Sequence, residues 1–193
     1  MMLSLMDINP HVRVAGTYVL TFDDRHHTFK NIKTLDSRLF YILDGSGTMK
    51  IENKLYPLHN GSFIMFSSQT EYAWQPDISS YLKYIAINFD YTQNHSDIKA
   101  SLGIEPAECV TDDMALEHVT ISDAEFLNSP IFINDFSSAE DKLWDIIEVL
   151  VSKGSYYTEM ASSLLKSVIV SVPRYLEKEK EGLGIRELNS IWF

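Results

Sequence analysis

The sequence contains six histidines and one cysteine, the residue types that most often ligate transition metals or act as catalytic bases and nucleophiles. His26 and His27 are adjacent, so on a β-strand their side chains would face opposite sides and could not hold one ion. The other four lie singly, in a turn, in a polar connector or in isolation: His59, His95, His11 and His118. We therefore expect no metal and no cofactor.

Catalytic motifs of other kinds are also missing from the sequence. There is no G-x-S-x-G nucleophile turn, no phosphate-binding glycine loop and no dyad of histidine and carboxylate. The lone cysteine, Cys109, excludes an internal disulfide and a cysteine-based zinc cluster, and we interpret it as a small, partly buried hydrophobic residue. These observations predict a protein that is not an enzyme.

The charge balance is acidic, with a formal net charge of −11. Such a surface repels phosphate and disfavours nucleic-acid binding by these residues alone. No run approaches the length of about 18 apolar residues that a membrane span needs, and the first residues lack the basic region of a secretory signal. Together with the single cysteine, this predicts a cytoplasmic protein without a membrane partner.

Short segments with a period of two run from about Val12 to Phe89, and they are rich in aromatic and β-branched residues. A hairpin turn is predicted at "LDGSG", and tight turns are predicted at "ENK" and "LHNGS", because Asp, Asn and Gly accept positive φ. About seven strands at this spacing favour a sandwich or a small barrel.

A polar, weakly periodic stretch follows Asp90, and from Ser137 the apolar period becomes 3.6. Ser137 and Glu140 predict a capping box at the start of a helix, and Gly154 is a suitable end. The apolar face of this helix comprises Leu143, Ile146, Ile147 and Leu150.

A second helix is predicted from about Tyr157, and Pro173 is expected to end or kink it. Its segment "LLKSVIVSV" is apolar nearly all round, which is more than contact with one neighbour requires. We expect a homodimer in which the partner covers the second side. The residues predicted for the dimer interface are Leu143, Ile147, Leu150, Leu164, Leu165, Val168 and Ile169.

The segments "NPHVRVAG", "LFYILDGSGTMKIENKLYPLHNGSFIMFSS" and "YIAINFD", in that order, resemble the amino-terminal sensing domain of AraC-type transcription regulators. The resemblance covers about residues 9–90 and continues more loosely through "SPIFINDF" and the helix pair. It implies a cupin β-barrel, a helical subdomain that usually mediates dimerisation, and a partner domain with two helix-turn-helix units that binds DNA.

The expected fold class is therefore mainly β with appended helices: a cupin-like barrel (double-stranded β-helix) followed by a two-helix dimerisation subdomain. The resemblance divides the chain into a sensing domain at 1–95, a connector at 96–136 and the helical subdomain at 137–193. The last segment, "GIRELNSIWF", is too short to contain the DNA-reading half. DNA is thus expected as a partner only through a C-terminal helix-turn-helix domain outside these residues.

Metal-binding cupins hold their ion with a His-x-His…Glu group and a later histidine, and the resemblance places each of these positions in this sequence. The glutamate position falls at Arg38, the paired histidines fall within "NIKT" at 31–34, and the last histidine falls at Tyr72. Arg38 would put a permanent cation where the metal would sit. A metal-free barrel is expected.

The implied partner is a small-molecule effector, a sugar or a small carboxylate, inside that barrel. If Arg38 points inward, strand alternation sends Phe40 inward too. A buried guanidinium needs a partner, which could be a ligand or a protein carboxylate such as Asp36 or Glu71. The residues predicted to bind the ligand are Arg38, Tyr72, Trp74, Phe40, Phe63, Met65 and Arg13.

Two other hypotheses stay open at this point. The first is a cupin enzyme that acts on a sugar or a small acid. The second is a purely structural dimerisation module whose barrel is filled by its own side chains, as small barrels commonly are.

Overall fold

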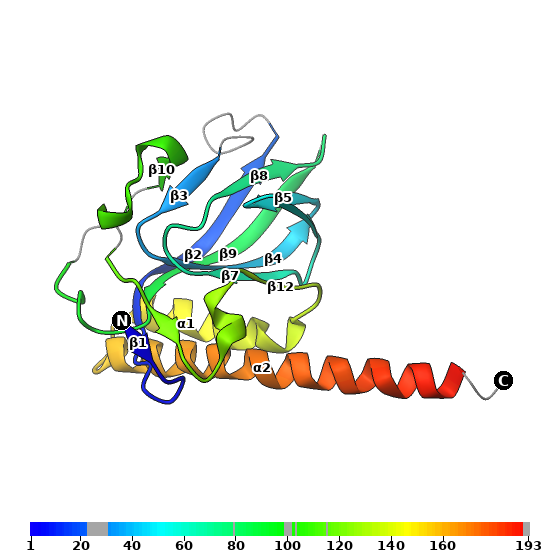
Figure 1. Cartoon of the computed structure of the whole chain (residues 1–193). Helices are drawn as coiled ribbons and strands as arrows, with labels where there is room; N and C mark the ends of the chain where they lie inside the picture. The colour runs from blue at the N-terminus through cyan, green and yellow to red at the C-terminus, as the bar shows by residue number, and fades with distance from the viewer. Residues whose placement is uncertain (23–30, 79, 99–101, 103, 115, 191–193) are drawn as a thin grey trace.

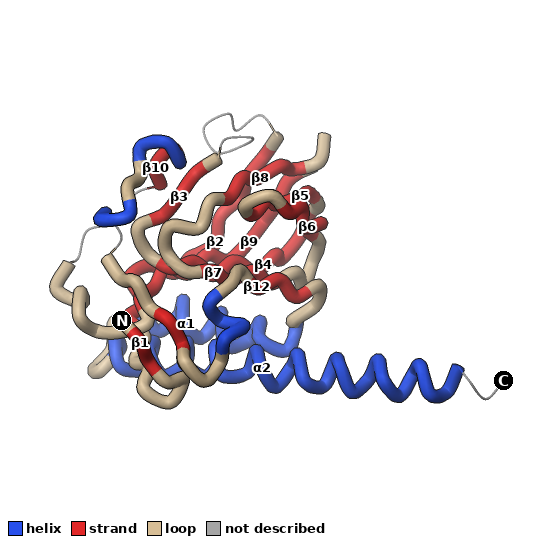
Figure 2. The backbone as a smooth tube through the Cα atoms, viewed as in Figure 1, coloured by secondary structure: helices blue, strands red, loops and turns tan. Residues whose placement is uncertain are grey.

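Two antiparallel sheets of five strands each face one another, and a pair of helices covers the outer face of one of them (Figures 1 and 2). The computed structural model describes residues 1–22, 31–78, 80–98, 102, 104–114 and 116–190, with backbone only for 180–190. His26 and His27 lie outside the described residues. Within the described part, no helix is long and apolar enough to cross a membrane.

The first sheet lies between the helices and the second sheet. Its strands, in spatial order, are β12 (Ile131–Ile133), β7 (Phe63–Phe66), β4 (Ser37–Gly45), β9 (Tyr81–Asp90) and β2 (His11–Thr21). The second sheet comprises β10 (Ile104–Pro106), β3 (Ile32–Thr34), β8 (Tyr72–Pro76), β5 (Gly47–Ile51) and β6 (Lys54–Leu58). The chain passes repeatedly from one sheet to the other, which is the winding of a cupin-like barrel. The predicted fold class, mainly β with a cupin-like barrel and appended helices, is confirmed.

Smaller elements flank the two sheets. The short strands β1 (Met2–Leu3) and β11 (Thr120–Ile121) pair in parallel beside α2. Four 3₁₀ turns are η1 (Ala107–Cys109), η2 (Asp112–Met114), η3 (Glu125–Asn128) and η4 (Ser137–Ala139). The helices are α1 (Glu140–Ser152) and α2 (Tyr157–Ser190), and the C-terminal part of α2 extends past the barrel in Figure 1. Cys109 is exposed, which corrects its interpretation as a partly buried residue.

The space between the two sheets is filled mainly by apolar side chains from both of them. The buried members are Leu20, Ile32, Phe40, Ile42, Met49, Ile51, Leu58, Ile64, Phe66, Tyr72, Trp74, Leu82 and Ala86. A second apolar cluster joins the outer face of the first sheet to the helices through Leu39, Tyr41, Phe63, Met65, Ile85, Ile87 and Phe89. Each central strand of the first sheet therefore belongs to two cores.

The dimer interface predicted for the helices is largely used within this one chain. Leu143, Leu165, Val168 and Ile169 each have an exposed fraction of 0% because they pack against the first sheet. Those four residues cannot reach a partner subunit, so their assignment to a dimer interface is corrected. Ile147, Leu150 and Leu164 are only partly buried. The all-round apolar character of "LLKSVIVSV" reflects a helix that contacts both a sheet and α1.

The start of α1 differs from the predicted capping box. Ser137 lies in the η4 turn, where its backbone N–H donates to Oδ1 of Asp135 at 3.0 Å. The Glu140 carboxylate accepts the hydroxyl of Tyr41 at 2.8 Å instead of bonding back to the helix start. Asp135 therefore accepts the backbone hydrogen bond in the turn before α1, and Glu140 connects α1 to β4 through Tyr41.

The predicted end of α1 at Gly154 and the predicted end of α2 at Pro173 are also corrected, whereas a kink at Pro173 remains a prediction. α1 ends at a left-handed Lys153 (φ 48°, ψ 41°) whose N–H donates to the Val149 carbonyl at 3.1 Å, one residue before Gly154. α2 begins at Tyr157 as predicted but continues through Pro173. Because proline lacks an N–H, this costs one intrahelical bond. Burial of Ile169 and Val172, both in the turn just before the proline, holds the helix together there.

The segment "LDGSG" is a crossing between sheets and not the predicted hairpin, since β4 pairs with β7 and β9 while β5 belongs to the other sheet. Gly45 adopts φ +92°, and a Cβ there would lie 1.8 Å from the Tyr81 carbonyl oxygen. Only glycine fits this crossing. The tight turn at "ENK" is confirmed by the pairing of Ile51 with Lys54.

Gly45→Ala is expected to lower the free energy of unfolding by more than about 2 kcal/mol, because the new methyl group meets backbone and the conformation is strained. Gly154→Ala is the matched control, since no atom lies within 4 Å of the added Cβ and its effect should stay within about 0.5 kcal/mol. Urea denaturation of the variants measures both. Equal stability of the two variants would contradict this account of the crossing.

Candidate ligand-binding site

Arg38 lies at one end of the barrel interior with an exposed fraction of 5%. On β4 it pairs with Phe66 of β7 and Asn88 of β9, so these three side chains share the inner face of the first sheet. The guanidinium Nε lies 2.7 Å from Oδ1 of Asp36, which is itself 1% exposed. Asp36 is therefore the protein carboxylate that neutralises Arg38, one of the alternatives left open above.

Tyr72 reaches the same interior from β8 of the opposite sheet. Its ring packs on Phe66 (centroids 5.0 Å apart) and Phe40 (5.8 Å). The Tyr72 hydroxyl is buried and has no hydrogen-bond partner among the described residues. Burial raises the pKa of this phenol, while the nearby Arg38 guanidinium acts to lower it. A neutral donor and acceptor thus stands unused beside the Asp36–Arg38 pair.

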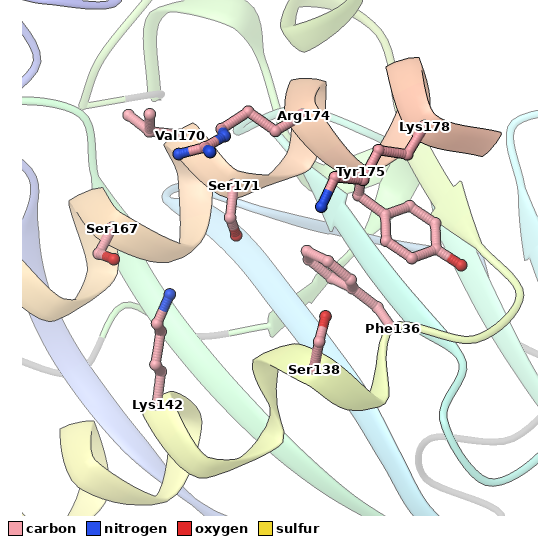
Figure 3. A pocket seen from close by; sticks show the side chains of 9 residues that line it. All are labelled: Phe136, Ser138, Lys142, Ser167, Val170, Ser171, Arg174, Tyr175 and Lys178. Atoms are coloured by element: carbon pink, nitrogen blue, oxygen red, sulfur yellow. The ribbon is translucent and has the colours of Figure 1, made fainter. Parts of the chain in front are cut away.

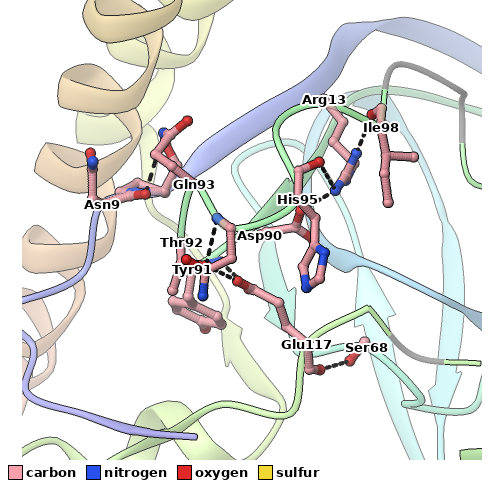
Figure 4. Close-up of polar contacts among 12 residues, drawn as sticks. Asn9, Arg13, Ser68, Asp90, Tyr91, Thr92, Gln93, His95, Ile98 and Glu117 are labelled. Carbon is pink, nitrogen blue, oxygen red and sulfur yellow. Dashed lines mark hydrogen bonds and ion pairs between the residues drawn. The ribbon is translucent and has the colours of Figure 1, made fainter. Parts of the chain in front are cut away.

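A second ion pair lies beside the first. Arg13 of β2 pairs with Asp90 at the end of β9, and its other N–H groups donate to the Ile98 carbonyl at 2.7 Å and the His95 carbonyl at 3.1 Å (Figure 4). Arg13 lies at a β-bulge of β2, where the register with β9 shifts. The bulge directs this side chain to Asp90 at the barrel end.

Backbone carbonyls of the segment after β9 accept hydrogen bonds from both arginines, although the Nε atom of each arginine has no aligned hydrogen bond. Arg38 donates through its terminal nitrogen to the Leu102 carbonyl at 3.2 Å, as Arg13 does to Ile98 and His95. Residues beyond the predicted barrel boundary at 95 therefore contact the site. The boundaries predicted at 95 and 136 remain predictions.

The Asp36 carboxyl has an unusual pKa. Burial raises the pKa of this group to about 6, against the lowering effect of the Arg38 guanidinium. Both of its oxygens lack a geometrically aligned hydrogen bond even though one lies close to Arg38. The pair is electrically neutral near pH 7 but retains unused hydrogen-bonding capacity.

The middle of the barrel is occupied by aromatic rings. Phe40 contacts Trp74, with ring centroids 5.0 Å apart, as well as the rings of Phe66, Tyr72 and Tyr84. Trp74 in turn lies 4.8 Å from Tyr84. The predicted inward positions of Phe40 and Trp74 hold in the structure, where both rings are core. The groups that could form hydrogen bonds with a ligand therefore lie at the end of the barrel that contains Asp36, Arg38 and the Tyr72 hydroxyl, which we call the polar end.

Two residues predicted for the ligand site face the wrong way. Phe63 and Met65 belong to the cluster between the first sheet and the helices, and Phe63 lies 5.1 Å from the Phe136 ring there. Their neighbours Ile64 and Phe66 face the interior, because they pair directly with Phe40 and Arg38 on β4. Directly opposed residues share a face of the sheet.

Asn88 was not predicted as a site residue, although it lies opposite Arg38 and is 6% exposed. Its signal in the sequence was a polar residue within the apolar strand "YIAINFD". Recognising it required the pairing register of β4 with β9. Its amide adds donors and an acceptor to the polar end.

The polar end offers hydrogen-bonding groups in a buried, charge-balanced setting. Arg38 is already neutralised, so a carboxylate ligand would bring an uncompensated charge into the interior. A ligand with hydroxyl groups could instead satisfy the unpartnered oxygen of Tyr72 and the unaligned oxygens of Asp36. Within the described residues, no three His, Cys, Asp or Glu side chains converge as a metal site requires.

Comparisons with known proteins add general likenesses of shape. No family model matches the chain, and no curated protein matches its sequence. Among solved structures, it is similar to ToxT from Vibrio cholerae O395 (TM-score 0.47, 10% identity, 84% of this chain and 54% of that one). It is also similar to a cupin protein from Bacteroides fragilis (TM-score 0.32, 12% identity, 39% and 64%).

A third similar structure is salicylate 1,2-dioxygenase from Pseudoaminobacter salicylatoxidans (TM-score 0.38, 14% identity, 49% of this chain and 24% of that one). The chain thus spans less than two thirds of each of these proteins. The cupin-like assignment rests on the strand order and the two cores described above.

The raised pKa of Asp36 predicts a specific pH dependence of stability. A carboxyl whose pKa rises from 3.8 to about 6 on folding binds more protons in the folded state between these values. Its contribution to the free energy of unfolding is therefore largest below about pH 4 and is lost as pH rises to about 6. The loss should be on the order of 2 to 3 kcal/mol.

Asp36→Asn tests this dependence. The difference in unfolding free energy between wild type and variant, measured by urea denaturation at a series of pH values, should fall from pH 4 to pH 6 and stay flat above. Asp77→Asn is the control, because this carboxyl is exposed and has no hydrogen bond or ion pair within the described chain. A difference that does not change with pH would show that Asp36 titrates normally.

Proposed function

We propose that this chain is the effector-binding and dimerisation domain of an AraC-type transcriptional regulator, and that it binds a neutral hydroxylated molecule such as a sugar at the polar end of its barrel. The sequence resemblance supplies the regulator class. The observation that carries the ligand chemistry is the buried, unpartnered Tyr72 hydroxyl beside the neutral Asp36–Arg38 pair.

The structure favours a sugar over the small carboxylate that the sequence equally suggested. A carboxylate would compete with Asp36 for Arg38 and leave one of the two anions unpaired in a low-dielectric interior. A hydroxyl group can donate to Asp36 and accept from Tyr72 without adding charge. Aromatic rings such as Phe40 and Phe66 border Tyr72 and suit the apolar face of a sugar ring.

Binding at this position also suggests how a signal would leave the barrel. A ligand that takes the place of the Leu102 carbonyl as partner of Arg38 would change how the segment beyond β9 is held. Arg13 donates hydrogen bonds to the same segment, at the carbonyls of Ile98 and His95. A ligand with different affinity for the two arrangements would shift their populations, and a linked DNA-binding domain would respond to that shift.

Dimerisation, in this proposal, uses the surface of the helices that the sheet leaves uncovered. Val151 (76% exposed) and Met160 (54%) flank the α1–α2 turn, near the partly buried Leu150 and Leu164 of the predicted interface. Tyr156, in the turn itself, is 80% exposed. These residues replace the four fully buried ones as the candidate contact.

Tyr72→Phe separates a binding role from a structural one. Removing a buried hydroxyl that has no partner should leave the unliganded protein as stable as wild type or more stable by up to about 1 kcal/mol. The same change should reduce the thermal stabilisation produced by the best ligand in a screen of monosaccharides and small carboxylates.

Tyr41→Phe is the matched control for this experiment. Its hydroxyl donates to Glu140 on the helix side of the sheet, so this variant should lose about 1 kcal/mol of stability and keep the full response to ligand. If no compound in the screen stabilises the wild type, or both variants respond equally, the assignment of the site is wrong. A stoichiometric metal in the purified protein would favour the cupin enzyme instead.

The oligomeric state tests the second half of the proposal. Light scattering at micromolar concentration should give the mass of a dimer for wild type and a smaller mass for Val151→Lys, which places a charge in the proposed contact. Leu55→Lys, at an exposed position (67%) on β6, is the control and should remain dimeric. A wild-type monomer would contradict the proposed dimer.

A further inference from the structure

A groove of about 310 Å³ lies between the start of α1 and the middle of α2, on the side of the first sheet away from the barrel interior. Three basic side chains line it; in Figure 3 the one from α1 extends toward α2, and one of the two from α2 runs along that helix toward Val170. These residues are Lys142 of α1 and Arg174 and Lys178 of α2.

Most of the described basic side chains of the two helices lie at this groove. The described side chains of α1 and α2 include four basic residues, and three of them line the groove. The fourth, Lys166, donates to the Met6 carbonyl at 2.7 Å. The chain has a net charge of −11 and the first turn of α1 carries Glu140 and Asp141, but the charged residues that line the groove are all basic.

No protein carboxylate neutralises these three cations within the described part of the chain, where ion pairs are formed by Arg13 and Arg38 only. Two carboxylates of this region have hydrogen-bond partners that are not cations. Glu179 accepts the Tyr175 hydroxyl at 3.5 Å, and Asp135 accepts the Ser137 N–H at 3.0 Å. The positive charge in the groove is thus open to an external anion.

Hydroxyl groups and an aromatic wall complete the lining. Ser138 and Ser167 present hydroxyls that carry no hydrogen bond within the described chain, whereas Ser171 already donates to the Val168 carbonyl at 2.7 Å. Phe136 and Tyr175 pack edge to face, with centroids 4.9 Å apart, at one end of the groove. Arginine, lysine and hydroxyl donors together match the oxygens of a phosphate group.

We propose that the groove between α1 and α2 is a binding site for a small soluble phosphate ester, held by Lys142, Arg174 and Lys178. The three cations outnumber the two negative charges of a phosphate monoester, and the groove has the volume of a small molecule. The site is separate from the barrel and does not depend on the sugar proposal. Occupancy would join α1 to α2 through a shared anion.

Isothermal titration with inorganic phosphate and with glycerol 3-phosphate tests this site, at an ionic strength held constant with chloride and with glycerol as the uncharged comparison. Both phosphates should bind wild type with one site per chain, and glycerol should not. Arg174→Gln and Lys178→Gln, both at exposed positions, should each weaken binding on the order of tenfold. Lys54→Gln, an exposed cation on β6, is the control and should bind as wild type does.

Two results would overturn the proposal. Equal binding by wild type and both groove variants would show a non-specific ionic effect. Binding to vesicles that contain phosphatidic acid, without binding of the free phosphates, would assign the cations to a membrane surface instead. Tyr72→Phe should leave phosphate binding unchanged, so this experiment and the sugar screen succeed or fail independently.

Discussion

The ion pair between Asp36 and Arg38 fixes the phase of β4, that is, which alternate residues of the strand face the barrel interior. Much of the rest of the structure depends on that phase. With Arg38 on the inner face, Phe40 and Ile42 also point between the sheets, and Leu39 and Tyr41 point toward the helices. A slip of one residue would turn the guanidinium into the apolar layer beneath α1 and α2. The cost of an unpaired buried charge therefore selects one register for the central strands.

The same phase explains why the helices are bound so firmly to the barrel. Tyr41, on the outer face of β4, reaches Glu140 at the start of α1, and Phe63 packs against Phe136 just before it. Most of the apolar stripe of each helix is buried in this layer, and Ile147, Leu150 and Leu164 are partly buried at its edge. The apolar composition of a helix therefore predicts how much of its surface is buried. It does not predict whether the same chain or a partner subunit covers that surface.

The two proposed sites differ in charge because they differ in burial. In the barrel, two arginines are matched by Asp36 and Asp90, which leaves hydrogen-bonding capacity without net charge. In the groove, Arg174 and Lys178 are exposed on the surface of α2, where solvation sustains unpaired cations at little cost. One site is suited to neutral hydroxylated molecules and the other to small anions. Their ligands would act on opposite faces of the first sheet.

The sequence by itself determined the fold class, the series of short strands and the two helices that follow them, and it made Arg38 a candidate for the inner face. Arg38 was a candidate because the resemblance places it where metal-binding cupins have an inward-facing glutamate, and the pairing of β4 with β7 and β9 then put it on the inner face. "FIMF" was not readable in the same way, since all four residues of β7 are buried and nothing in the segment marks which face is inner. Only pairing with β4 decided that Ile64 and Phe66 face the barrel.

Other details also required the tertiary structure. The positive φ of Gly45 is compatible with either a hairpin or a crossing between sheets. Only the tertiary structure, in which Gly45 packs closely against the Tyr81 carbonyl and β5 joins the other sheet, shows that it is a crossing. Pro173 disfavours a helix locally, but the burial of Ile169 and Val172 outweighs the lost hydrogen bond. Local preferences therefore set which elements form, whereas contacts between distant residues set their register, their ends and their exposed faces.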